Sequence, residues 1–531
     1  MELKRTILAV VLSMAVLIAF QYWVGPKRPA QRPAQETAKS EPVAKPEARP
    51  PAPAAPAAEP PVRERAARRT VLENRELRVE LSNLGGAVVS AKLKGYRDRI
   101  GAGGAPVELL GAPSGLDRAA LTALLEQGEG ADALYEEVER ATDRVVYRWR
   151  SPGGLEVVKT YRLPEEGYVL HVEVEVRNAS EAPVRERLGL RLVHDYSSEE
   201  KNRLSRYNFQ GPAYYAGEYE EVKLKKVAKG IRVSGEISWA ALVNGYFLVA
   251  AVPGEGAAAD LRIGAYRGME RVVEVELGSP AFDLSPGQTV DFSYRIYAGP
   301  KLQEALAPLG SHLTEVVHYG FFHPVAKPLL WFLKAIYRMT GNYGVAIIVL
   351  TVLVKAVFWP LSARSFRSMQ KMKELQPKLQ RLKEKYGDDR ERLNREVMQL
   401  YRTHRVNPLG GCLPIVVQIP VFFALYRILL GSIELRHAPF MLWIQDLSAK
   451  DPYYITPVLM GVTMFLQQKL TPASGTSEGQ MKMMLYGMPV VFTFLFLNFP
   501  SGLVLYWLVN NILSVLQQAM MLRQSKAAEA S

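Results

Sequence analysis

A single lysine, Lys355, lies within an otherwise apolar run at residues 343–360. A helix that rises ~1.5 Å per residue crosses the hydrocarbon core of a bilayer in roughly 20 residues, so residues 343–362 can form one span. Lys355 is then ~10 Å from the Ser362 end, inside the hydrocarbon, where an ammonium costs several kcal/mol unless polar groups or water solvate it. Two interpretations are open. Either the methylene stem carries the charge to the headgroups, or the lysine faces a hydrated cavity lined by protein.

Other apolar segments also carry amides and hydroxyls. For each of them alone, a hydrogen bond between helices is the ordinary explanation. Together with a lysine at similar depth, they indicate a positively charged hydrophilic groove that lowers the cost of bringing polar peptide into the bilayer. The predicted groove residues are Lys355, Thr351, Gln418, Asn510, Asn511 and Ser514. Two further apolar segments, 455–470 and 484–498, are shorter than a ~30 Å hydrocarbon core, which favours local thinning of the bilayer.

The composition limits the chemistry of the chain. Its 531 residues carry a formal net charge of +13 and one cysteine, Cys412. Much of the basic excess lies beside apolar segments, where the positive-inside rule and anionic lipids account for it, so we expect no direct nucleic-acid function. A lone thiol cannot form an intrachain disulfide, and the histidines show no ligand spacing, so no metal is predicted. Because a nucleotide-binding motif is also absent, we expect no cofactor and no enzymatic activity.

The N-terminal part reads as an anchor and a tether. Lys4 and Arg5 precede an apolar run, and aromatic residues follow it where a cleaved signal peptide would carry a small-residue site. We therefore interpret residues 1–24 as an uncleaved transmembrane anchor whose N-terminus is cytoplasmic. Residues 25–61 are rich in Pro, Ala and charged residues, and they predict an extended tether that buries no core.

Residues 62–300 change to a period of two, which indicates β-strands. Runs at 77–81, 170–177, 272–277 and 290–296 alternate apolar and polar residues, with Gly and Pro turn signals between them. Many short strands with few helices predict an antiparallel β-sandwich. It shows no catalytic constellation, although a bound sugar or peptide remains an open alternative. Residues 301–341 then predict amphipathic helices that lie along the membrane surface.

A strongly basic segment at 363–408 follows the span at 342–362. Leucine and methionine residues recur at helical spacing, Gly387 ends a first helix, and Asp388 or Asp389 begins a second. The segment predicts a cytoplasmic helical hairpin, either a solvated charged surface or a docking surface for a partner. Its candidate recruitment residues are Lys371, Lys373, Lys378, Arg381, Lys385, Arg392 and Arg395.

The remaining segments complete a six-span topology. Apolar runs at 409–431, 455–470, 484–498 and 502–522 predict four more transmembrane helices. The loop at 432–454 carries few basic residues and is predicted to be periplasmic, whereas the loop at 471–483 and the tail at 523–531 are predicted to be cytoplasmic. The fold class is therefore a polytopic α-helical membrane protein with an inserted all-β periplasmic sandwich.

From about Gly341 to Leu522 the chain resembles the YidC membrane-insertase family. The motifs that carry the resemblance are NPLGGCLP (407–414), QIPVFFALY (418–426), DPYYITPVLMGVTMF (451–465) and FPSGLVLYW (499–507). The anchor, tether and β-domain resemble the Gram-negative form, in which a periplasmic β-supersandwich lies between the first two spans. The family's groove arginine falls on Lys355, which keeps the charge but not the planar guanidinium fork.

The resemblance implies a function, partners and a location. A chain of this family inserts membrane proteins and helps them fold, through a groove open to cytoplasm and lipid, alone or with the Sec translocon. The implied partners are newly made membrane proteins, the Sec translocon, ribosomes with the signal recognition machinery, and anionic lipids, and the implied location is the bacterial inner membrane. Substrate-contact positions carried over by motif are Cys412, Pro414, Ile419, Pro420, Phe422 and Tyr506.

Two other functions compete with this one. A secondary transporter or channel would also place a charge within the membrane, but the sequence shows no repeated halves with interrupted helices. An envelope sensor whose β-domain binds carbohydrate would leave the intramembrane lysine and the basic hairpin without a role.

Overall fold

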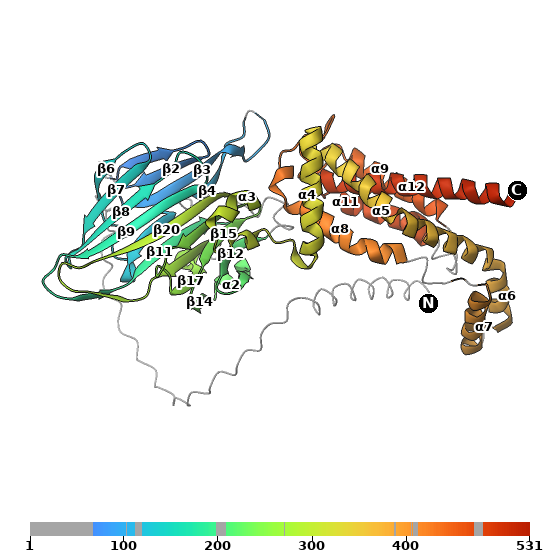
Figure 1. Ribbon diagram of the computed structural model, residues 1–531, viewed down its shortest axis with the longest axis horizontal. Helices are drawn as coiled ribbons and strands as arrows, with labels where there is room; N and C mark the ends of the chain where they lie inside the picture. Colours follow the sequence, from blue (N-terminus) through green and yellow to red (C-terminus); the bar gives the residue numbers. More distant parts are fainter. Residues whose placement is uncertain are drawn as a thin grey trace, which may run out of the picture. The chain divides into compact units, whose positions relative to one another are not determined.

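A computed structural model describes residues 67–530 except for residues 102, 112–118, 198–208, 270, 387–388, 405, 407–412 and 472–481. The anchor and tether predicted at residues 1–61 lie outside the described residues, as do Cys412 and nearly all of the loop at 471–483. The described chain consists of a β-domain, from β1 (Arg69–Glu73) to β20 (Thr289–Pro300), followed by helices (Figure 1).

Two nine-stranded antiparallel sheets make up the β-domain. The first sheet contains β1, β2 (Leu77–Ser82), β3 (Ala87–Arg97), β4 (Pro106–Gly111), β5 (Leu121–Leu125), β11 (Leu188–Asp195), β14 (Ile231–Ser234), β17 (Asp260–Ala265) and β18 (Val272–Gly278). The second sheet contains β6 (Glu136–Arg140), β7 (Arg144–Arg150), β8 (Leu155–Arg162), β9 (Val169–Asn178), β12 (Gln210–Tyr215), β13 (Tyr219–Glu221), β15 (Trp239–Asn244), β16 (Phe247–Pro253) and β20. A small separate sheet pairs β10 (Val184–Glu186) with β19 (Phe282–Leu284).

The alternation in sequence is the reason for this sandwich. In β9, Leu170, Val172, Val174 and Val176 are buried whereas the residues between them are half-buried or exposed. A strand presents successive side chains to opposite faces, so one face of β9 contributes to the core. Most buried side chains of the two sheets form one hydrophobic cluster, and a second cluster includes the alternate residues of β15 and β16. The predicted strands at 77–81, 170–177, 272–277 and 290–296 are confirmed as β2, β9, β18 and β20.

The core of the sandwich also contains a lysine. Lys159 takes an inward position on β8 and is 0 % exposed. Its Nζ donates to the carbonyl oxygens of Gly85 (2.6 Å) and Ala123 (2.7 Å) and to the Thr122 hydroxyl (3.3 Å), and it lies 4.4 Å from the centre of the Tyr135 ring. Because Gly85 follows β2 and Ala123 lies on β5, this one ammonium joins the second sheet to the first.

The helical part begins after β20. Its α-helices are α3 (Gln303–Leu306), α4 (His323–Thr340), α5 (Tyr343–Glu374), α6 (Gln376–Tyr386), α7 (Arg390–Thr403), α8 (Leu413–Gly431), α9 (Ile455–Leu470), α11 (Met488–Phe496) and α12 (Ser501–Ala530). Single turns are η6 (Ala307–Leu309), η7 (Leu313–Val316), η8 (Gly320–Phe322), η10 (Ile433–Leu435) and the π-helical η11 (Met483–Gly487). Within the β-domain lie the short α2 (Leu224–Val227), η2 (Glu126–Gly128) and η5 (Tyr266–Gly268).

Helix α5 is longer than the span predicted at 342–362. Asn342 begins it as an N-cap whose side chain accepts a hydrogen bond from the Val345 amide, and the helix continues through Pro360 to Glu374. The predicted end of the first helix before Gly387 and the predicted start of the second at Asp389 are confirmed, since α6 ends at Tyr386 and Asp389 is the N-cap of α7. The predicted continuity of the first helix is wrong, because the chain breaks at Leu375 between α5 and α6. Lys371 and Lys373 consequently belong to the end of α5 and not to the hairpin of α6 and α7.

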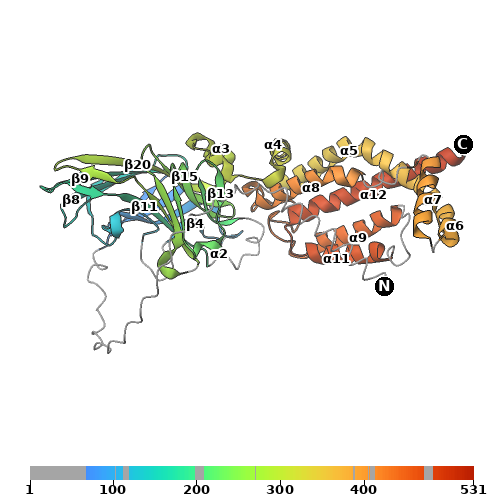
Figure 2. The ribbon, with the colours of Figure 1, turned by 90° about the horizontal axis from the view of Figure 1, so that it is seen from below.

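Two of the described helices, α5 and the segment Ser501–Gln524 of α12, are long and apolar enough to cross a membrane. Helix α8 contains a shorter apolar stretch, Val417–Gly431, and another runs from Met483 to Phe496. A shared buried cluster joins α4, α5, α8, α9 and α12, and α9 packs beside both α11 and α12 (Figure 2). The described chain thus combines a β-rich domain with a helical part that contains two candidate membrane spans.

Helix α5 and the α8–α9 loop approach closely at Gly344. A Cβ placed there would come within 2.0 Å of Cδ2 of Phe440, whose carbonyl accepts a hydrogen bond of 2.7 Å from Asn342. We expect Gly344→Ala to destabilise the helical part by about 1–3 kcal/mol, because Phe440 has to leave its site. Gly487→Ala is the matched control, since its Cβ would meet Met483 at an ordinary 3.5 Å. Thermal unfolding in detergent tests this, and equal midpoints for both variants would contradict it.

Candidate functional site

The ammonium of Lys355 is directed toward helix α12. Its Nζ donates to the Ser514 hydroxyl at 2.8 Å, and that hydroxyl in turn donates to the Asn510 carbonyl at 2.7 Å. Ser514 is 6 % exposed, whereas Lys355 is only half-buried, so the lysine has a polar protein partner on one side and an open side. Because α5 and α12 pack together, the charge lies at the junction of two membrane helices.

A second polar pair lies one turn earlier on α12. Gln418 of α8 donates from Nε2 to Oδ1 of Asn510 at 3.3 Å, and its side chain lies near the hydroxyl of the buried Tyr506. Asn510 is thus shared, since its carbonyl accepts from Ser514 and its amide oxygen accepts from Gln418. Helices α5, α8 and α12 therefore supply one connected polar cluster, which we call the groove cluster: Lys355, Ser514, Asn510, Gln418 and Tyr506.

Two of the predicted groove residues make their hydrogen bonds outside the groove cluster. The Thr351 hydroxyl donates to the Ile347 carbonyl of its own helix at 2.6 Å and is 2 % exposed. Asn511 donates from Nδ2 to the Met460 carbonyl of α9 at 3.4 Å, on the side of α12 that faces α9. Successive residues of a helix point about 100° apart, which is why Asn510 and Asn511 face different neighbours.

The predicted substrate-contact positions fall on α8 and α12. Ile419 and Pro420 follow Gln418 and are half-buried. The ring of Phe422 packs edge-on against Trp507 at 5.3 Å between centres. Tyr506 is 3 % exposed in this structure, so a substrate would reach it only if α8 or α12 shifted. Of Pro414 only the backbone is described, and Cys412 is outside the described residues.

Three glutamines outside the predicted groove residues lie on α9 and α12. Gln468 near the end of α9 and Gln517 and Gln518 on α12 have buried amide atoms that make no hydrogen bond with described residues. Gln518 also donates from Nε2 to the Thr471 hydroxyl at 3.2 Å. Unpaired buried amides in a membrane bundle are costly unless water or a ligand solvates them. The signal was available in the sequence, because Gln467–Gln468 and Gln517–Gln518 are paired glutamines at the ends of apolar runs.

All seven predicted recruitment residues of the basic segment are exposed: Lys371, Lys373, Lys378, Arg381, Lys385, Arg392 and Arg395. Three apolar residues of this segment are buried: Leu375, Leu379 and Val406. Lys378 Nζ lies 3.0 Å from Nε2 of His404, which brings the two ends of the hairpin together. The cations of Lys385 and Arg392 lie over the Tyr386 ring at 5.2 and 5.3 Å. The hairpin therefore presents its charge outward on a small apolar base.

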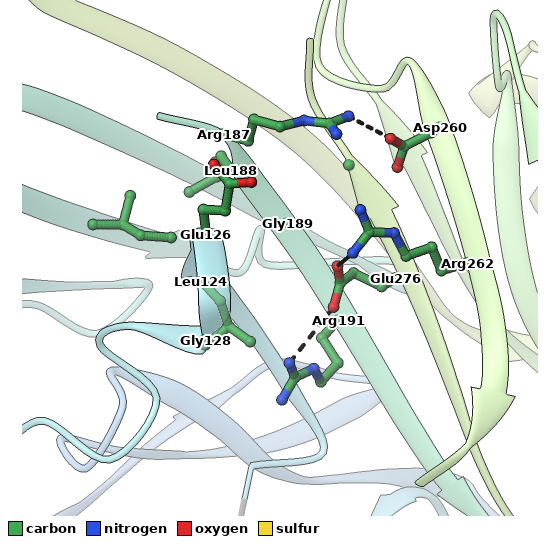
Figure 3. A pocket seen from close by; sticks show the side chains of 12 residues that line it. Leu124, Glu126, Gly128, Arg187, Leu188, Gly189, Arg191, Asp260, Arg262 and Glu276 are labelled. Atoms are coloured by element: carbon green, nitrogen blue, oxygen red, sulfur yellow. Dashed lines mark hydrogen bonds and ion pairs between the residues drawn. The ribbon is translucent and has the colours of Figure 1, made fainter. Parts of the chain in front are cut away.

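The β-domain has a charged cavity on the first sheet, of about 170 Å³ (Figure 3). Arg187 pairs with Asp260, and Arg191 and Arg262 lie 3.5 and 3.6 Å from Glu276. Within this cavity, therefore, each of the three arginines already has a carboxylate beside it. The arrangement shows a compensated charge network rather than a site with an excess of either sign.

Comparisons with known proteins cover both parts of the chain. A family model described as "60Kd inner membrane protein" matches residues 335–528, and one described as "YidC periplasmic domain" matches residues 69–332. The "Membrane protein insertase YidC" of Geobacter sulfurreducens is 45 % identical over 468 residues, covering 85 % of this chain and 86 % of the relative. That of Geotalea daltonii is 40 % identical over 529 residues, covering 97 % and 98 %. A solved structure titled "Active YidC insertase crystal structure with the first transmembrane domain resolved" is 19 % identical, with a TM-score of 0.37, and covers 84 % of this chain and 91 % of that one.

Proposed function

Because the chain belongs to the YidC family of membrane protein insertases, we propose that it inserts newly made proteins into the bacterial inner membrane and helps them fold, alone or beside the Sec translocon. In this proposal six spans place both termini in the cytoplasm and the β-domain in the periplasm. The groove cluster opens toward the cytoplasm and the lipid.

The hydrogen bond between Lys355 Nζ and the Ser514 hydroxyl supports this function best. A lysine that only snorkelled to the headgroups would not need a buried hydroxyl on another helix. Its half-buried position leaves donors of the ammonium for a substrate or water. In our proposal the ammonium attracts acidic or polar parts of an incoming segment and replaces part of the hydration that this segment loses.

The other members of the groove cluster also lower the free-energy barrier to insertion, through hydrogen bonds and without any covalent step. Gln418 and Asn510 offer amide donors and acceptors that can exchange their mutual hydrogen bond for one to a peptide backbone. Ile419, Pro420 and Phe422 lie next to Gln418 on α8, so a substrate would meet an apolar wall directly beside the polar groups. The short helices α9 and α11 thin the surrounding lipid and shorten the path of the translocated segment.

The basic hairpin is proposed to bring substrates to the groove. We expect replacement of residues 376–403 by a short Gly/Ser linker to reduce insertion several-fold in reconstituted vesicles, because the basic docking surface is lost. The contact between Lys378 and His404 shows that the two ends of the hairpin lie close together, so a short linker can join the remaining chain. Insertion of a radiolabelled single-span substrate measures the effect.

The matched variant keeps the hairpin and reverses two of its charges. Arg392→Glu with Arg395→Glu alters exposed residues of α7 only, so we expect a stable protein. Its rate of insertion should also be reduced, and that rate should depend less on salt concentration than in the parent. Insertion at the parent rate by both variants would remove the hairpin from the proposal. Newly made membrane proteins, the Sec translocon and ribosomes with the signal recognition machinery are the partners that this surface would meet.

A further inference from the structure

A cationic cavity lies where the β-domain meets the α8–α9 loop. It has a volume of about 370 Å³, and its lining includes Arg97, Arg99, Ile100, Arg436 and His437. The first three residues lie at the end of β3 and in the turn after it, and the other two lie in the loop after α8. Unlike the compensated cavity on the first sheet, it has three arginines in its wall and no acidic residue among its lining residues.

Contacts between the β-domain and the α8–α9 loop fix the shape of this cavity. Arg436 donates from Nη2 to the Arg97 carbonyl at 2.5 Å, and its guanidinium lies 5.2 Å from the centre of the Phe247 ring. The Tyr246 hydroxyl donates to the carbonyl of Leu430, near the end of α8, at 3.2 Å. His437 adopts a left-handed backbone (φ 58°), and its amide donates to the Asp446 carboxylate at 3.0 Å. A non-glycine residue keeps that conformation only where its surroundings fix it.

The charges around the cavity sum to a positive excess. The nearby acids are Asp98, whose carboxylate lies 3.7 Å from Nε of Arg99 and accepts from the Ala105 amide, and Asp446, which binds the His437 and Ser448 amides. A third acid, Glu434, acts on the lining residue Tyr96, but Lys334 compensates its charge at 2.7 Å. Arg97 donates from Nη1 to the Gly104 carbonyl, which uses a donor but no charge. Against the three arginines stand two carboxylates that also serve backbone amides, so the cavity favours an anion.

Exposed apolar side chains occur in the same two segments that line this cavity. Ile100, in its wall, is 51 % exposed, and Met441 and Leu442, further along the same loop as Arg436, are 52 % and 73 % exposed. The loop also carries Tyr453, which is 68 % exposed, directly before α9. Aromatic residues at the ends of membrane helices mark the headgroup level, and exposed aliphatic residues there favour contact with acyl chains.

We propose that this cavity binds the phosphate of an anionic phospholipid headgroup in the periplasmic leaflet, with Arg99 and Arg436 as its charged ligands. The assignment rests on the proposed topology, which places the α8–α9 loop at the periplasmic surface. Arginine presents several N–H donors in a fixed plane and suits phosphate oxygens. The exposed Ile100 in the cavity wall favours a lipid over a free phosphate ion, because an ion would make no use of an apolar side chain.

The test uses the full chain in detergent, titrated with phosphatidylglycerol or with phosphatidylcholine of the same acyl chains and followed by native mass spectrometry. We expect the parent to bind phosphatidylglycerol at least fivefold more tightly, and Arg99→Gln and Arg436→Gln each to reduce that preference about fivefold. Arg99 is 84 % exposed in its side chain, so Arg99→Gln leaves the fold intact. Arg185→Gln, at a similarly exposed residue that pairs with Asp283 elsewhere in the β-domain, should have no effect.

Three results would overturn the assignment. They are equal binding of the two lipids by the parent, an equal loss of preference in the Arg185→Gln control, and displacement of the lipid by millimolar inorganic phosphate or an acidic peptide. Insertion measured with the same preparation separates this inference from the proposed function. A parent that binds phosphatidylglycerol but inserts no substrate contradicts the insertase proposal and leaves the lipid site in place.

Discussion

Lys355→Ala is expected to reduce insertion of substrates with charged translocated tails by roughly tenfold, which corresponds to a loss of about 1.4 kcal/mol at the rate-limiting step. The physical reason is that the ammonium at the α5–α12 junction is the one cation of the groove cluster, and its removal leaves amides and hydroxyls that attract an acidic segment only weakly. Insertion into proteoliposomes of matched substrates with acidic and neutral tails measures the effect.

The control variants separate charge from packing. Lys355→Arg keeps the charge and should retain most of the activity, because the proposal requires a cation and not a particular hydrogen-bond geometry. Ser514→Ala removes only the hydroxyl that fixes the ammonium and should reduce insertion less than Lys355→Ala does. If the parent, Lys355→Ala and Lys355→Arg insert both substrates equally, the groove charge plays no part in insertion.

A second large effect is expected in the β-domain, at Lys159. Lys159→Met should lower the free energy of unfolding of the β-domain by about 1–3 kcal/mol at pH 7, because the Gly85 and Ala123 carbonyls lose their buried donor. Hydrogen exchange of the β8 amides in the full chain reports this stability directly. Lys225→Met, which alters a lysine on the short helix α2, is the control and should leave β8 unchanged.

The size of this effect should depend on pH. Burial lowers the pKa of Lys159 from 10.5 to about 7. Between these values the unfolded chain holds the proton and the folded β-domain has released it, so the stability of the parent rises as the pH increases from about 7 to 10.5. Lys159→Met has no such group, and the difference between parent and variant should therefore widen over this range. A difference independent of pH would show that the carbonyl acceptors keep the ammonium charged.

The lysines of this chain illustrate two different uses of an amine inside the protein. Lys159 has acceptors around it and no exposed surface, so its N–H donors serve to join the two sheets. Lys355 has one hydroxyl partner and an open side, so its charge remains available. Substitution at the first should change stability, whereas substitution at the second should change insertion while the protein stays folded.

Much of the fold follows from local patterns in the sequence. The alternation in β9 determines which face of the strand is buried, because side chains repeat every two residues in a strand. The apolar run of α5, broken only by Lys355, indicates a helix long enough to span the hydrocarbon core. The same kind of alternation places Lys159 between Val157 and Tyr161 on the inward face of β8, so the burial of this lysine could have been predicted from the sequence. The break at Leu375 could also have been predicted, because Pro377 disfavours a helical residue before it and suits the first turn of the new helix α6.

The partners of the polar groups were decided by the tertiary structure alone. Lys355 and Ser514 are 159 residues apart, and no local pattern tells which helix faces which. For the same reason the sequence predicts Asn510 and Asn511 for one groove, whereas packing turns Asn510 toward Gln418 and Asn511 toward α9. Sequence determines which groups must escape the lipid, because burial of an unpaired charge or amide is costly. The packing of distant helices decides where each of them finds its partner.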